Sequence, residues 1–190
     1  MGNSNHNYLP KDYIDVYEKK TFLSEQEIQK LFKNFRDIYK PGNYDYRNIR
    51  DAFLTCDEFI ANFKPIRENP FKDRLFRIFS EYNPNGINFE ETLDMMSVFS
   101  ETAPIEVKTH YAFKLYNFDD DNYLSKEDLL EMLKRVVNCN GDYESRIIQS
   151  AIDGIIKESD LDKDGKISYA EFELLIGKIP NFMKTFVIKI

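Results

Sequence analysis

The sequence has no tryptophan, two cysteines and two histidines, and this scarcity excludes several classes of protein. Cys56 and Cys139 are too few for a disulfide framework, so we expect both thiols to be reduced in a cytoplasmic protein. His6 and His110 are isolated, and neither has a partner at the spacing of a zinc site or a catalytic pair. The chain also lacks a phosphate-binding loop and a glycine-rich dinucleotide turn. We therefore expect that the protein is not an enzyme.

Long apolar runs and a basic face are missing as well. No run approaches the roughly twenty apolar residues of a membrane-spanning helix, and residues 1–20 do not resemble a secretory signal. The net charge of −7 argues against a nucleic-acid-binding surface. The chain does contain 42% hydrophobic residues, enough for a core, and 16 of its residues are phenylalanine. We expect such an acidic, phenylalanine-rich chain to bind metal ions and basic amphipathic helices.

One segment, residues 160–171 with the sequence DLDKDGKISYAE, matches the EF-hand calcium loop at every defined position. Such a loop supplies about six to eight oxygen ligands to Ca²⁺ at fixed offsets, and Gly165 permits its sharp turn. We call this segment the fourth loop, because three related units precede it in the chain. Its predicted ligands are the side chains of Asp160, Asp162 and Asp164, the backbone carbonyl of Lys166, Ser168 directly or through water, and Glu171. The Lys166 side chain is expected to have no part in ligation.

The alternative for this segment is an acidic surface loop that binds no ion. Apolar residues on both sides argue against it, because two helices that flank a metal loop need inward-facing side chains. Ser168 and Glu171 also form the S-x-x-E capping box of a helix that leaves the loop. The sequence therefore favours a Ca²⁺ site.

A second loop, which departs from the EF-hand pattern at three positions, lies at residues 117–128. The predicted ligands of this third loop are Asn117, Asp119, Asp121, the backbone carbonyl of Tyr123, Ser125 directly or through water, and Asp128. Asn117 brings no charge, and Asp128 is one methylene shorter than the usual glutamate, which favours the six-coordination of Mg²⁺. We expect a weaker Ca²⁺ site or one that Mg²⁺ occupies; a loop without any ion is the alternative. Leu124 and Ile167 should face each other in a short ribbon between the two loops.

Two earlier units keep the helices but not the ligands. Residues 80–91 have Ser80, Tyr82 and Pro84 at the first three ligand positions, so we expect no metal there. The first unit begins at the Ser24–Glu27 capping box, and residues 38–52 are too long and too poor in carboxylates for a metal loop. Its first helix should bury Ile28, Leu31, Phe32 and Phe35, and its second helix should run through Phe53, Phe59 and Ile60.

These repeats predict an all-α fold of four EF-hand helix–loop–helix units in two paired lobes, with about eight helices and a short β-ribbon between paired loops. We expect an N-terminal extension at 1–20, a metal-free lobe at 21–104, a metal-binding lobe at 105–180 and an apolar tail at 181–190. A linker at 138–145 should separate the third and fourth units.

Segments along nearly the whole chain resemble the calcium- and integrin-binding family of EF-hand proteins. They are MGN at the start, YEKKTFLSEQEI, ENPFKDRLFRIFS, MMSVFSETAP followed by YAFKLYNF, and PNFMKTFVIKI at the end. Two degenerate loops followed by two complete ones, with aspartate at the last position of the third loop, also fit that family. Calcineurin B is similar in fold but usually keeps four working loops, whereas this chain has at most two.

The resemblance implies an adaptor or sensor that binds amphipathic helices, such as cytoplasmic tails of integrin α subunits, kinases or mechanotransduction channel subunits. The candidate groove residues are Met95, Met96, Phe99, Phe113, Met132 and Leu133. Ordinary core packing is the alternative for each of them. A calcium buffer and a calcineurin B-like regulatory subunit of a phosphatase or kinase remain alternatives for the whole protein, which we expect to be a monomer or a weak dimer.

The two ends of the chain carry further hypotheses. The tail ends in Phe186, Val187, Ile188 and Ile190, and we expect this apolar run to pack into or beside the groove and to move when a partner binds. Gly2 could carry a myristoyl group, although His6 stands where the motif has serine or threonine. One such chain gives only weak membrane binding, so we expect a cytoplasmic protein with peripheral contact at the inner face of the plasma membrane.

Overall fold

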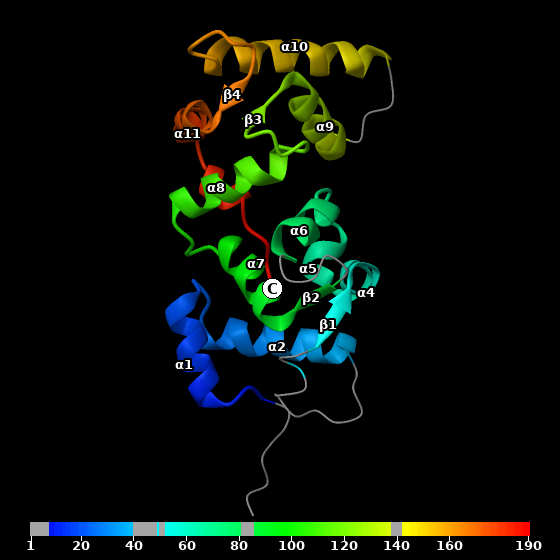
Figure 1. The fold of residues 1–190 in the computed structure, drawn as a ribbon, viewed down its shortest axis with the longest axis vertical. Helices are drawn as coiled ribbons and strands as arrows, with labels where there is room; N and C mark the ends of the chain where they lie inside the picture. Colours follow the sequence, from blue (N-terminus) through cyan, green and yellow to red (C-terminus); the bar gives the residue numbers. More distant parts are fainter. Residues whose placement is uncertain (1–7, 40–48, 50–51, 81–85, 138–141) are drawn as a thin grey trace, which may run out of the picture. The chain divides into compact units, whose positions relative to one another are not determined.

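A computed structural model describes residues 8–39, 49, 52–80, 86–137 and 142–190 (Figure 1). The chain forms two compact units, one of residues 1–104 together with 186–190 and the other of residues 105–185. Within the described ranges, no helix is both long enough and apolar enough to cross a membrane. The prediction of a mostly helical EF-hand fold with two short antiparallel strand pairs is confirmed.

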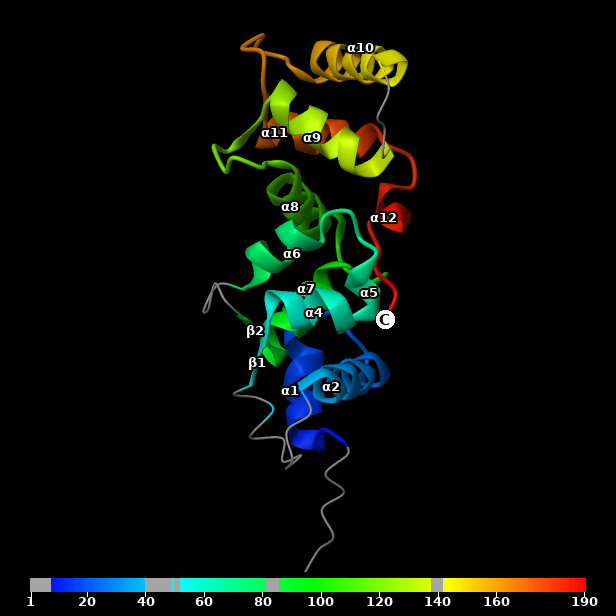
Figure 2. The same ribbon diagram turned by 90° about the vertical axis from the view of Figure 1, so that its right-hand side faces the viewer.

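The N-terminal unit is built of helices around one short ribbon. Its described helices are α1 (Lys11–Lys20), α2 (Glu25–Tyr39), α4 (Cys56–Asn62), α5 (Lys64–Arg67), α6 (Lys72–Phe79) and α7 (Phe89–Val98). Strands β1 (Phe53–Thr55) and β2 (Gly86–Asn88) pair in antiparallel fashion, with Leu54 opposite Ile87, and both views show them side by side (Figures 1 and 2). The two degenerate units therefore still pair as EF-hands do.

The start of the second helix differs from the sequence prediction. Phe53 was expected on this helix, but it lies in β1 and is exposed. The helix begins at Cys56 because Thr55 and Glu58 form a capping box, in which the Glu58 N–H donates to Thr55 Oγ1 and the Thr55 N–H donates to Glu58 Oε2. The prediction for Phe59, which is fully buried on α4, is confirmed.

Helix α2 follows its apolar spacing. Ser24 and Glu27 make the predicted capping contacts, with the Ser24 N–H 2.8 Å from Glu27 Oε2. The four residues expected on the inner face, Ile28, Leu31, Phe32 and Phe35, are all fully buried. The rings of Phe32 and Phe35 meet Phe89 edge-on, with centroids 5.5 and 5.8 Å apart, which fixes α2 against α7.

Residues 11–20 are more than an extension, because they form helix α1 of the N-terminal unit. Ile14 and Tyr17 are buried, and the Tyr17 hydroxyl donates to Glu90 Oε1 at 2.8 Å. The short helices α5 and α12 were not predicted either, so the described residues hold more than the expected eight helices.

The C-terminal unit contains the two complete loops. Its described elements are α8 (Ile105–Tyr116), β3 (Tyr123–Leu124), α9 (Lys126–Val137), α10 (Asp142–Ser159), β4 (Ile167–Ser168), α11 (Tyr169–Lys178) and α12 (Phe182–Thr185). Strands β3 and β4 pair with Leu124 opposite Ile167, as predicted, and both side chains are buried. The expected linker at 138–145 is too long, since α10 already begins at Asp142; residues 138–141 lie outside the described ranges.

The last ten residues divide between the two units. Residues 182–185 form α12 of the C-terminal unit, where fully buried Lys108 donates to the Met183 carbonyl at 3.3 Å. Residues 186–190 belong to the N-terminal unit, where the rings of Phe186 and Phe99 lie 4.7 Å apart. The Ile188 N–H also donates to the Phe99 carbonyl at 3.0 Å, so the tail ends as an extended segment beside the end of α7.

Candidate metal centre

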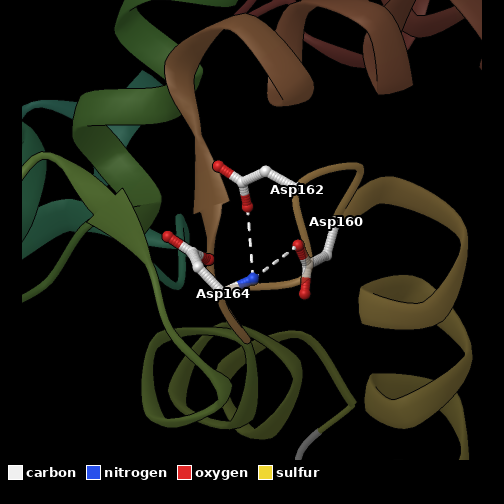
Figure 3. Close-up of side chains that lie close together, drawn as sticks. All are labelled: Asp160, Asp162 and Asp164. Atoms are coloured by element: carbon white, nitrogen blue, oxygen red, sulfur yellow. Dashed lines mark hydrogen bonds between the residues drawn. The ribbon is translucent and has the colours of Figure 1, made fainter.

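The fourth loop gathers three carboxylates at one place. One oxygen from each of Asp160, Asp162 and Asp164 lies within 4.8 Å of the others, and no other such group of acidic, histidine or cysteine side chains occurs in the described parts of the chain. Figure 3 shows the Asp164 backbone nitrogen between two of these carboxylates; its N–H lies 3.2 Å from both Asp160 Oδ1 and Asp162 Oδ1. The loop backbone itself thus holds the carboxylates together.

The turn of this loop depends on two residues in the left-handed region. Lys163 has φ of 63° and Gly165 has φ of 86°. At Gly165 the N–H donates to Asp160 Oδ2 at 2.9 Å, which closes the loop onto its first ligand position. A side chain at this φ would strain the backbone, which explains the glycine.

Glu171 closes the loop from the first turn of α11. Its Oε1 accepts the Leu161 N–H at 2.7 Å, and its Oε2 accepts the Ser168 N–H at 2.8 Å. Hydrogen bonds from the Ser168 backbone and side chain, with those from Leu161 and Asp162, lower the pKa of Glu171 against the opposing effect of desolvation. The carboxylate is therefore ionised and placed with both oxygens toward the loop.

Asp162 lies among other carboxylates whose negative charges change its pKa. A hydrogen bond from Asp164 lowers its pKa, but desolvation and the charges of Asp164, Glu171 and Asp160 together outweigh this bond and raise the pKa. A divalent cation would remove this repulsion. A set of carboxylate and carbonyl oxygens with no nitrogen or sulfur donor fits Ca²⁺, and a bound ion would supply only charge neutralisation and a fixed loop geometry.

The third loop repeats the backbone of the fourth. Asp120 and Asn122 have φ of 59° and 67°, at the two positions where the fourth loop has Lys163 and Gly165. Asparagine tolerates this region better than most residues, so the turn is kept without glycine. The conformation is thus that of an EF-hand loop despite the substitution.

Asp128 reaches the same backbone group as its longer counterpart. Its Oδ1 accepts the Phe118 N–H at 2.8 Å, at the loop position that donates to Glu171 in the fourth loop. Its Oδ2 accepts the Ser125 N–H at 2.9 Å, and Asp128 is buried. Asp128 therefore closes the third loop although its side chain is shorter.

The third loop differs from the fourth in the surroundings of Asp121. Lys166 Nζ, from the fourth loop, lies 2.8 Å from Asp121 Oδ2. The Lys166 side chain was expected to have no part in ligation, but it pairs with a predicted ligand of the neighbouring site. The two residues are 45 positions apart, so spacing within either loop gives no sign of this pair.

Comparisons with known proteins agree with this geometry. A family model described as an EF-hand domain pair matches residues 106–176, which include both complete loops. The protein named calcium and integrin-binding family member 2 of Homo sapiens is 38% identical over 192 residues, which cover all of both chains. Its namesake in Drosophila melanogaster is 35% identical over 193 residues, again covering all of both chains.

The chain belongs to the calcium and integrin-binding family. It is a calcium-binding EF-hand protein, and the family consists of regulatory proteins. The family model covers only the C-terminal pair of units, which is where the structure gathers the carboxylates.

The register of the first degenerate loop was missed in the sequence. Because Leu54 lies opposite Ile87, Leu54 takes the eighth loop position, and Thr55 and Glu58 take the ninth and twelfth. The T-x-x-E pattern before an apolar helix could have revealed this register. In the second degenerate loop Glu91 keeps the twelfth position and caps α7 with Asn88. Ser80 is buried, while Tyr82 and Pro84 lie outside the described residues.

The predicted groove residues are distributed over both units. Met95, Met96 and Phe99 are buried in the N-terminal unit, where Phe99 contacts Phe186. In the C-terminal unit Phe113 is buried against Phe172, with ring centroids 5.5 Å apart. Met132 and Leu133, on α9, are half-buried. The predicted lipidation site, Gly2, lies outside the described residues.

Proposed function

We propose that the chain is a regulatory adaptor whose C-terminal pair of loops binds metal ions and which binds an amphipathic helix of a partner protein. The metal-binding part of this proposal rests on the close approach of Asp160, Asp162 and Asp164, with both Glu171 oxygens turned toward the loop. On this proposal, the fourth loop binds Ca²⁺ and uses the Lys166 carbonyl and Ser168 as further ligands.

For the third loop we propose Ca²⁺ or Mg²⁺ as the ion. Asn117 removes one negative charge from the site, and the shorter Asp128 favours one-oxygen ligation and six-coordination, the geometry that Mg²⁺ requires. The loop conformation supports an ion site, since Asp120 and Asn122 reproduce the backbone of the fourth loop. The third loop would then be filled at resting Mg²⁺ levels and the fourth loop would respond to Ca²⁺.

Calorimetry with and without Mg²⁺ tests the two assignments. Asp160→Asn should abolish the tighter Ca²⁺ transition and leave the weaker one, because it removes one charged ligand from the fourth loop only. Glu158→Gln is the matched control, since this exposed residue of α10 loses the same charge outside the loop. Normal tight binding by Asp160→Asn would contradict the assignment of the fourth loop. A weaker transition that Mg²⁺ does not affect would contradict the assignment of the third loop.

The proposed partner is an amphipathic helix with apolar residues at i, i+3, i+4 and i+7. The name of the relatives includes integrin binding, which makes a cytoplasmic tail of an integrin α subunit the first candidate. The tail residue Phe186, which covers Phe99, would have to move if the helix binds at this face. A kinase or channel subunit would present the same kind of helix.

The partner proposal is tested by titration of a synthetic integrin α-tail peptide into the Ca²⁺-loaded protein. We expect a one-to-one complex that a peptide of the same composition and scrambled order does not form. No complex with the integrin peptide, together with no protein recovered in fixed ratio from native cytosol, would leave a calcium buffer as the better description. Recovery of a phosphatase or kinase would instead favour a regulatory subunit.

We further propose a cytoplasmic location with contact at the inner face of the plasma membrane. A myristoyl group on Gly2 would support only weak membrane binding by itself. Mass spectrometry of the natively expressed protein tests whether Gly2 is myristoylated, and an unmodified N-terminus would contradict lipid attachment.

A further inference from the structure

The β3–β4 ribbon brings a cation of one loop to a predicted ligand of the other. Tyr123 lies opposite Ser168 and Leu124 opposite Ile167, so the start of β4 lies beside the end of β3, within the third loop. Lys166 precedes β4, and its Nζ lies 2.8 Å from Asp121 Oδ2. The same ammonium lies 5.2 Å from the centroid of the Tyr123 ring, at the seventh position of the third loop.

Both oxygens of Asp121 are engaged in this arrangement. Oδ1 accepts the Tyr123 N–H at 2.8 Å, and Oδ2 holds the Lys166 ammonium. A divalent ion in the third loop needs an oxygen of this residue, at the fifth loop position. The ion would therefore have to displace the ammonium or accept a positive charge next to its own.

The positive charge of Lys166 affects the third and fourth loops unequally. The fourth loop has a lysine at its seventh position, whereas the third loop has a tyrosine, Tyr123, there. The carboxylates that act on the Lys166 ammonium are Asp121, Asp119 and Asp164, and the hydrogen bond with Asp121 is the main reason for its raised pKa. Two of these three carboxylates belong to the third loop, so the lysine neutralises mainly the negative charge of that loop.

We propose that the Lys166 side chain is an internal competitor for the third-loop cation and lowers the affinity of that loop. The inference rests on the proposed ion site at residues 117–128. The pair is partly exposed, with 44% of the Lys166 side chain and 31% of the Asp121 side chain accessible, so the effect is limited and screened by salt. Removing the lysine should raise third-loop affinity about two- to fivefold, the range of an exposed ion pair.

The test compares Lys166→Gln with Lys163→Gln. Both substitutions remove one positive charge from the fourth loop, but Lys163 is at the fourth position and Lys166 is the residue that contacts Asp121. Lys166→Arg keeps the charge and serves as the rescue variant. Ca²⁺ is titrated into each full-length protein while the backbone amides of Asn122 and Gly165 report the third and fourth loops by NMR.

We expect the Asn122 amide to titrate at lower Ca²⁺ in Lys166→Gln than in Lys163→Gln, while Lys166→Arg stays near the wild type. The difference should shrink when the ionic strength is raised, because salt screens the exposed pair. Equal third-loop constants in the two glutamine variants would overturn the role of Lys166. An Asn122 amide that responds in no variant would instead overturn the ion site itself, so the two failures are distinguishable.

Discussion

At the scale of single residues, the last ligand position is an aspartate in the third loop and a glutamate in the fourth. Asp128 and Glu171 accept hydrogen bonds from corresponding backbone groups, those of Phe118 and Leu161, at 2.8 and 2.7 Å. The shorter side chain therefore still holds the loop closed. We expect its length to limit the number of oxygens that it can offer an ion. Ca²⁺ accepts two oxygens from one carboxylate, whereas Mg²⁺ keeps octahedral geometry.

Asp128→Glu should accordingly favour Ca²⁺ in the third loop. We expect its Ca²⁺ affinity to rise by about an order of magnitude, a small part of the span of EF-hand loops, with a smaller change for Mg²⁺. Competition calorimetry of the two ions measures this preference. Glu127→Asp, which changes the same kind of side chain at an exposed neighbouring position, is the control. An unchanged Ca²⁺/Mg²⁺ ratio in Asp128→Glu would refute the role given to side-chain length.

At the scale of elements, one capping arrangement ends each of the four loops. It joins Thr55 with Glu58, Asn88 with Glu91, Ser125 with Asp128, and Ser168 with Glu171. In the complete loops the capping carboxylate is also the predicted last ligand, whereas the degenerate loops keep only the cap. Loss of metal ligands has therefore left the starts of α4 and α7 intact.

The cap of α4 makes stability depend on pH. Hydrogen bonds from the Thr55 backbone and then its side chain lower the pKa of Glu58 below 4.5. A lowered folded-state pKa means that the stabilisation is complete above 4.5 and is lost as the pH falls through the folded-state value. Glu58→Gln should thus be less stable than the wild type at neutral pH, and the difference should narrow in acid. Urea unfolding across pH 3–7 measures this; a difference independent of pH would show that the charge is not involved.

At the scale of the whole chain, the tail is the segment whose position matters most for the proposed function. Phe186 is 8% exposed and contacts Phe99, a predicted groove residue, although the two are 87 positions apart. The Phe79 ring also lies near Phe99, with the two ring centroids 6.5 Å apart. An aromatic side chain of the tail thus packs against Phe99, which itself contacts Phe79.

Phe186→Ala should uncover Phe99. Loss of the buried ring should lower the free energy of unfolding by about 2–3 kcal/mol, and a hydrophobic dye should bind more strongly to the folded protein. Lys189→Ala, at an exposed position of the same segment, is the control and should change neither quantity. Unchanged dye fluorescence in Phe186→Ala would argue against the tail as a cover.

The sequence alone predicts the positions of the third and fourth loops, because the predicted ligands of each loop lie within twelve consecutive residues. It also determined the inner face of α2, where apolar spacing dictates burial of residues such as Phe32 and Phe35. The contacts of Lys166 with Asp121 and of Phe186 with Phe99 became visible in the folded chain alone. These contacts join residues far apart in the chain, and they depend on strand register and packing, which no local pattern encodes.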